Sequence, residues 1–278
     1  MSPATEVNLI MLRELRRNFR SVKGIILSVI SLIGGAGASL LLVKFQEFKR
    51  AQFADMSPDD MMALREKGLG QVYDPDTAKS LSTSPEVLFA VLMLTIWLTP
   101  LIISMLGYDT LSSEVQYRSV RYWSVRARRW SYFLGKFAGL FVTISAITLA
   151  MHALVWVVCI ARGEASAGAT FGWGFRFWAT TLPMSAAWCA IATFISSLFR
   201  VPIWALLVTM ASFFGLWLLW VIGVASNADA FTYVYPNTYD KFLLSPHAWR
   251  ALTGVGGCAA IAAVALAGGI TVFARKDI

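Results

Sequence analysis

The sequence predicts an all-α membrane protein, a single domain over residues 1–278. It would have six transmembrane helices, an N-terminal amphipathic helix at the membrane surface and a short cytoplasmic helix between spans two and three. Hydrophobic residues make up 57% of the chain and charged residues only 14%, whereas soluble domains are about 45–50% apolar and about 25% charged. The apolar residues also gather in runs of about 20, the length that a helix needs to cross about 30 Å of hydrocarbon.

Six apolar runs define the predicted spans, which cover residues 24–43, 87–106, 133–160, 177–199, 201–225 and 254–274. The third run is long enough to tilt or to extend beyond the bilayer. Between the first two spans, residues 44–86 predict an external loop with short helices, such as 58–66. The aromatic-rich segment 226–253 suits the membrane–water boundary and could dip back as re-entrant helices where protein covers its backbone.

The distribution of lysine and arginine predicts the orientation. Basic residues cluster before span one, between spans two and three, between spans four and five, and after span six: Arg13, Arg16, Arg17, Arg20 and Lys23; Arg118, Arg121, Arg126, Arg128, Arg129 and Lys136; Arg200; Arg275 and Lys276. The positive-inside rule then places both termini in the cytoplasm and the chain in the bacterial inner membrane. Because basic residues lie between apolar runs, the net charge of +8 indicates topology and contact with anionic lipid, not nucleic acid.

Residues 5–22 form the amphipathic pattern at the N-terminus. At 100° per residue, one face carries Met11, Leu12, Leu15, Phe19 and Val22, and the opposite face carries Arg13, Arg16, Arg17 and Arg20. A helix of this kind lies in the membrane interface with its arginines toward lipid phosphates. The alternative is an ordinary surface helix docked on the protein. The transmembrane run that follows directly favours the interfacial position.

The sequence shows no catalytic, nucleotide-binding or metal-binding motif. The three cysteines lie in or at the edge of apolar runs, and the two histidines, His152 and His247, are far apart. The glycine-rich stretch 34–39 lacks the ending of a phosphate loop and lies within a span, where small residues permit close helix packing. Charges are almost absent from the span centres, which argues against a proton relay. An uphill transport step would therefore need another subunit to supply the energy.

The cytoplasmic segment between spans two and three carries the strongest functional signal. Ser112 or Ser113 can cap a short helix with Glu114 in its first turn. Glu114 and Arg118 are four residues apart, in the orientation that stabilises a helix surface. A short charged helix held between two spans could act as a lever for a docked partner. The alternative is a solvated loop that carries charge only for topology.

This segment resembles the corresponding loop of ABC-2 type permeases. In that family an acidic residue begins a coupling helix and an arginine precedes a Gly-Lys pair at the next span, places taken here by Asp109, Glu114, Arg129, Gly135 and Lys136. Residues 13–17 resemble the family's interfacial elbow helix, residues 273–277 its usual ending, and the aromatic loop with Pro236 its external re-entrant helices. Two positions depart from the family pattern: Arg118-Ser119 replaces a frequent Gly-Thr pair, and Arg126-Ala127 stands where a proline is frequent.

The resemblance implies partners and residue roles. It implies a cytoplasmic ABC ATPase subunit, which would hold the ATP and Mg, and a second permease chain, most simply a homodimer. Glu114, Arg118 and Arg121 would contact the ATPase, and Arg128, Arg129 and Lys136 would anchor span three at lipid phosphates. The alternative function is a membrane scaffold that uses the same ATPase to drive an extracytoplasmic assembly through a periplasmic partner. The apolar spans hint at lipids, hydrophobic compounds or peptides as substrate.

Overall fold

The computed structural model describes residues 2–53, 56–117 and 127–276, and all regular elements in these ranges are helices. Six of them are long and apolar enough to cross a membrane. They are α2 (Val22–Gln52), α5 (Glu86–Gly107), α8 (Arg129–Ala161), α9 (Ala167–Leu198), α10 (Pro202–Ser226) and α13 (Ala248–Arg275). The all-α membrane fold predicted from the sequence is thereby confirmed.

Several spans extend well beyond the apolar runs that predict them. Helix α8 has 33 residues, which at about 1.5 Å per residue gives about 50 Å, far more than the hydrocarbon thickness of about 30 Å. Helix α2 continues to Gln52 instead of ending at residue 43, and α9 begins at Ala167 instead of residue 177. Hydropathy detects only the part of a helix that lies in hydrocarbon, so polar extensions are invisible to it.

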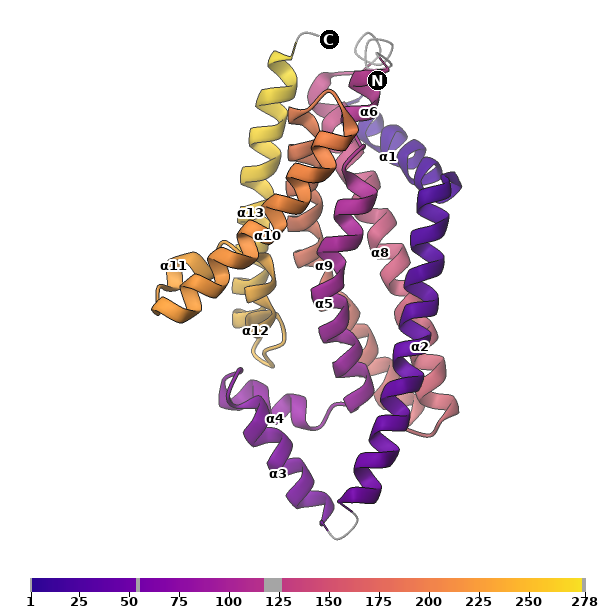
Figure 1. Cartoon of the computed structure of the whole chain (residues 1–278), viewed down its shortest axis with the longest axis vertical. Coiled ribbons are helices and arrows are strands. Elements are labelled where there is room, and N and C mark those ends of the chain that lie inside the picture. Colours follow the sequence, from indigo (N-terminus) through magenta and orange to yellow (C-terminus); the bar gives the residue numbers. More distant parts are fainter. Residues whose placement is uncertain (1, 54–55, 118–126, 277–278) are drawn as a thin grey trace.

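Helix α1 (Pro3–Arg20) lies at an angle to α2 and is separated from it by Ser21 alone. Ser21 has extended backbone angles, and its hydroxyl accepts a hydrogen bond from Gly24 N at 3.1 Å, which caps the start of α2. Figure 1 shows that α1, α6 (Ser112–Gln116) and both chain termini gather at one end of the molecule. The segments that the sequence assigns to one side of the membrane therefore do lie together.

The opposite end carries α3 (Pro58–Leu69) and α4 (Pro75–Ser82), which project from the long helices (Figure 1). Their starts are capped by Ser57, which accepts from Asp60 N, and by Asp74, which accepts from Thr77 N. The short helix predicted over 58–66 lies within α3. The segment predicted to be external thus consists of a helical extension of α2 followed by two short helices.

Helix α9 is the centre of the bundle and packs against α5, α8, α10 and α13. Helices α2 and α10 are peripheral and expose most of their residues. Between α10 and α13 the chain forms α11 (Asp229–Thr232), the 3-10 helix η1 (Pro236–Tyr239) and α12 (Asp240–Leu243). η1 is buried against α9 and α13. There Asn237 donates to Ile96 O at 2.9 Å and accepts from Trp188 Nε1 at 2.8 Å, so protein satisfies the polar groups of this returning segment.

Candidate functional site

Helix α1 packs directly along α8 because α8 has two glycines one turn apart. A Cβ on Gly135 would lie 2.6 Å from Cβ of Ile10, and a Cβ on Gly139 would overlap the side chain of Glu14. Glycine at both positions lets the two helix backbones approach closely, as in other Gly-x-x-x-Gly contacts. This approach brings the Glu14 carboxylate of α1 beside the Lys136 ammonium of α8.

Four charged side chains from three elements meet at this contact. Lys136 Nζ donates to Glu14 Oε2 at 2.6 Å and also to Glu114 Oε1 of α6. Arg17 of α1 donates to both carboxylates, reaching Glu114 Oε1 at 3.2 Å and Glu14 Oε1 at shorter range. We call Glu14, Arg17, Glu114 and Lys136 the charge cluster. Its two positive and two negative charges balance, which is the condition under which ionised groups persist in a protein interior.

The charge cluster is buried, so its charged groups must be paired with one another. Lys136 and Glu14 are each 1% exposed and Glu114 is 6% exposed. Ionised side chains are almost never buried this deeply unless they are paired. Removing one member would leave the buried cluster with an uncompensated charge, at a cost of about 3–5 kcal/mol in comparable sites. The cluster therefore ties α1, α6 and α8 into one unit.

Further polar contacts fix the same region. Ser196 Oγ on α9 accepts from Leu111 N at 3.0 Å and Ser112 N at 3.1 Å, at the start of α6. The predicted serine cap is wrong, because Ser112 and Ser113 donate to the carbonyls of residues 108 and 109. Lys23 on α2 binds Asp109 and donates to Leu106 O at 3.1 Å. The segment that leaves α5 is thus held by α2, α8 and α9.

The structure reassigns three of the basic residues predicted to anchor at lipid phosphates. Lys136 is buried in the charge cluster, where its ammonium has no access to lipid. Arg17 pairs with Glu14 and Glu114. Arg129 donates to Ala274 O at 2.6 Å and Lys276 O at 3.2 Å, and so caps the end of α13. The position of these residues near span ends predicts contacts to lipid phosphates. In the folded chain, their cationic groups instead contact carboxylates and backbone carbonyls.

The remaining predicted site residues are placed as follows. Arg13, Arg16, Arg20 and Arg128 are exposed, a position compatible with the predicted phosphate contacts. Glu114, predicted to contact an ATPase, instead turns inward to Lys136. Arg118 and Arg121 lie outside the described residues, and their predicted contacts stay predictions.

Sequence reasoning missed Glu14 as a site residue. The buried side of α1 is Glu6, Ile10, Glu14 and Asn18, a four-residue spacing that places them on one face. Asn18 donates to Thr143 Oγ1 of α8 at 3.1 Å, so this polar stripe faces the protein. The apolar residues Leu9, Leu12 and Phe19 are exposed instead, as an interfacial helix requires. The available signal was the polar stripe itself, together with a lone lysine inside the apolar run of α8.

The fold and this site define a class: a multi-pass α-helical membrane protein whose N-terminal surface helix is joined through buried charges to the segment between spans two and three. The family model described as ABC-2 family transporter protein matches residues 9–278, nearly the whole chain. The chain belongs to this family and is a membrane component of a transporter. No curated protein matches it.

Proposed function

We propose that the chain is the permease subunit of an ATP-driven transporter, worked by a separate ATPase subunit that holds the ATP and Mg. The ATPase would dock on the segment between α5 and α8. In this arrangement α1, α6 and both termini face the cytoplasm, as the positive-inside rule predicts, and the protein resides in the bacterial inner membrane. Family membership supports the permease role.

The charge cluster is the observation that carries this proposal. α6 follows α5 after a short turn and is joined through Glu114 to Lys136 on α8 and to Arg17 on α1. A force applied to the segment after α6 would therefore reach two spans and the surface helix together. A solvated topology loop would need no buried ionic contact to its neighbours, and a buried ionic network is costly to assemble unless all its members are paired.

The proposed roles of the loop residues follow from their burial. Glu114 holds α6 in place from within, because its carboxylate is turned toward Lys136. Arg118 and Arg121 remain the proposed contacts to the ATPase. The coupling element in this proposal is α6 with the segment that follows it, and its internal support is the charge cluster.

Two permease chains are proposed per complex. The outward faces of α5 and α10 support a helix–helix interface, since they expose large apolar side chains such as Trp97, Leu207 and Phe214. Trp97 also packs edge-on against Trp220, with ring centroids 6.2 Å apart, so the two helices present one continuous apolar face.

Co-expression with a candidate ABC ATPase subunit tests the proposal. Arg121→Glu should reduce co-purification of the ATPase by about tenfold, since reversing a contact charge costs on the order of 1.4 kcal/mol or more. Arg16→Glu is the matched control, an identical charge reversal on exposed α1, and should leave co-purification intact. Equal recovery of the ATPase with both variants would remove the proposed docking segment.

The scaffold alternative uses the same ATPase but a partner outside the membrane. The projecting helices α3 and α4 give such a partner a surface (Figure 1). Co-purification of a periplasmic protein that is lost on deleting α3 and α4, together with ATPase activity that no hydrophobic compound alters, would favour the scaffold. ATPase stimulation by such compounds in the unaltered complex would favour transport.

A further inference from the structure

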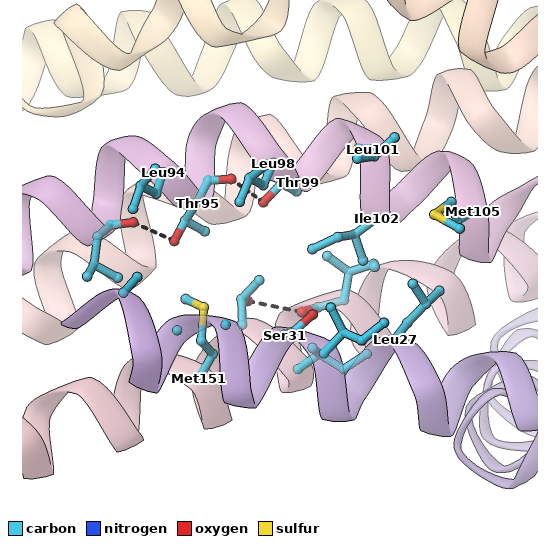
Figure 2. A pocket seen from close by; sticks show the side chains of 18 residues that line it. Leu27, Ser31, Leu94, Thr95, Leu98, Thr99, Leu101, Ile102, Met105 and Met151 are labelled. Carbon is cyan, nitrogen blue, oxygen red and sulfur yellow. Dashed lines mark hydrogen bonds between the residues drawn. The ribbon is translucent and has the colours of Figure 1, made fainter. Parts of the chain in front are cut away.

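A cavity of about 290 Å³ lies between α2, α5 and α8, and the lining residues Ile30, Leu98 and Leu101 are exposed at its rim. Its walls include Leu27, Ile30, Leu98, Ile102, Ile147 and Met151. Figure 2 shows Leu27 of α2 and Ile102 of α5 extending into the space between the two helices. The cavity is separate from the charge cluster, since it shares no residue with it.

The cavity walls suit a hydrocarbon ligand and little else. Among the described residues that line it, no side chain is charged. The lining hydroxyls of Thr95, Thr99 and Thr148 are turned back to carbonyls of their own helices, at 2.7, 2.6 and 3.0 Å. Of the hydroxyls that line the cavity, only Ser31 Oγ has no hydrogen bond among the described residues, so the walls offer a polar occupant at most one partner. The rest of the wall is apolar and gains free energy from an apolar occupant, whereas a polar one would lose most of its hydration without new hydrogen bonds.

The length of the cavity matches one leaflet. On α2 its lining runs from Leu27 to Ala38, which at about 1.5 Å per residue spans about 16 Å, roughly half of the hydrocarbon thickness of about 30 Å. The space exists because α2 has glycine where a side chain would fill it. A Cβ on Gly34 would meet no atom within 4 Å, whereas a Cβ on Gly35 would overlap the side chain of Met151. The glycine-rich stretch thus permits close packing at Gly35 and leaves an opening at Gly34.

Positive charge lies at one end of the cavity. Leu27 is one turn from Lys23, which pairs with Asp109, and the exposed Arg16 and Arg20 lie on α1, before Lys23. This end is the one where α1 lies along the membrane surface, the depth at which lipid phosphates are found. An anionic head group there would complement the exposed arginines, which attract acidic lipids electrostatically.

We infer that this cavity binds one acyl chain of an anionic phospholipid from the leaflet on the α1 side, with the head group at the exposed Arg20. The lipid chain fills the space left at Gly34 and packs between α2 and α5. This site does not depend on the ATPase, so it stands apart from the proposed transport function.

The test uses the purified full chain in nanodiscs that contain phosphatidylglycerol with a photoactivatable diazirine in its acyl chain. Peptide mapping should place the label on the α2 and α5 peptides that line the cavity. Gly34→Leu puts two or more methylene-sized groups into the space and should reduce this labelling by about tenfold. Gly37→Leu is the matched control, because its Cβ also meets no atom within 4 Å and residue 37 does not line the cavity.

A smaller substitution and a second lipid probe test the same cavity. Gly34→Ala, a smaller change, should give an intermediate loss if the leucine variant does not fold. A phosphatidylcholine probe with the same diazirine chain should label less than phosphatidylglycerol, and Arg20→Gln should remove that difference. The inference is overturned by equal labelling of the Gly34→Leu and Gly37→Leu variants, by equal labelling with both head groups, or by label spread evenly over α10. Disulfide-linked dimers of Leu98→Cys in intact membranes would show that a second copy fills the cavity, which also overturns it.

Discussion

The two ends of the molecule use ion pairs in opposite ways. At the α1 end, Lys136, Glu14 and Glu114 are buried and share contacts across three elements. At the α3–α4 end, Arg250 pairs with Asp74 at 2.7 Å and His247 with Asp76 at 3.1 Å, with all four side chains between 27% and 67% exposed. Solvent screens the second set, so only the first set can couple helices strongly.

The charge cluster should show the largest effect. Lys136→Met keeps an unbranched side chain of similar size but leaves Glu14 and Glu114 without their shared ammonium, and should cost about 3–5 kcal/mol. Thermal unfolding of the detergent-solubilised protein measures the loss. Lys67→Met, on exposed α3, is the matched control and should change the midpoint little. A midpoint shift of equal size in both variants would abolish the contrast between the two ends.

The contact between α1 and α8 should be the next most sensitive. Gly139→Leu places a side chain where Glu14 already lies, so α1 must move away, at a cost of about 2–3 kcal/mol for overpacking. Gly172→Leu on α9 meets no atom within 4 Å and should be tolerated. Proteolysis of α1 in proteoliposomes, compared between the two variants, reports whether α1 has come off α8. Equal protection of α1 in both would contradict a close-packed contact.

Asp240 sharpens the comparison because it is a partly buried carboxylate at the weakly coupled end. Burial raises the pKa of Asp240 to about 6, and the Tyr73 hydroxyl donates to its Oδ2 at 3.2 Å. A carboxyl pKa raised in the folded state stabilises the fold fully below about pH 4, and this contribution is lost as pH rises through about 6. Asp240→Asn should therefore stabilise the protein at pH 7.5 by about 1–2 kcal/mol.

The pH dependence is the control for this prediction. The gain from Asp240→Asn should shrink toward zero as the pH falls from 7.5 to 4, because the native carboxyl is then neutral. Thermal unfolding midpoints of both proteins across this range measure it. A gain that is independent of pH would mean that the amide acts through packing and not through the removed charge.

The exposed ion pairs should show the smallest effect. Asp76→Asn removes the carboxylate that faces His247, and a pair this exposed contributes less than about 1 kcal/mol. The midpoint of thermal unfolding should move by no more than the scatter between preparations, and added salt should not change the difference. A loss of stability close to that of Lys136→Met would mean that ion pairs stabilise both ends of the molecule equally.

The amount that sequence could predict differs between the fold and the site. The six spans were predictable because a run of apolar residues such as 201–225 is a local property that needs no knowledge of neighbours. That α1 is an amphipathic helix was predictable from its 3.6-residue periodicity. The role of Lys136 was not predictable, because the sequence around a lysine at a span end is the same whether its ammonium contacts a lipid phosphate or a carboxylate of the protein.

What the sequence by itself determined is therefore the six spans and the family, which the match over residues 9–278 confirms. Only the tertiary structure decided which charges meet. Lys136 pairs with Glu14, 122 residues away in the chain, and with Glu114, 22 residues away. The physical reason is that hydrophobicity acts residue by residue, whereas pairing a buried charge requires two backbones to approach, and glycines 135 and 139 allow that approach only once α1 lies on α8.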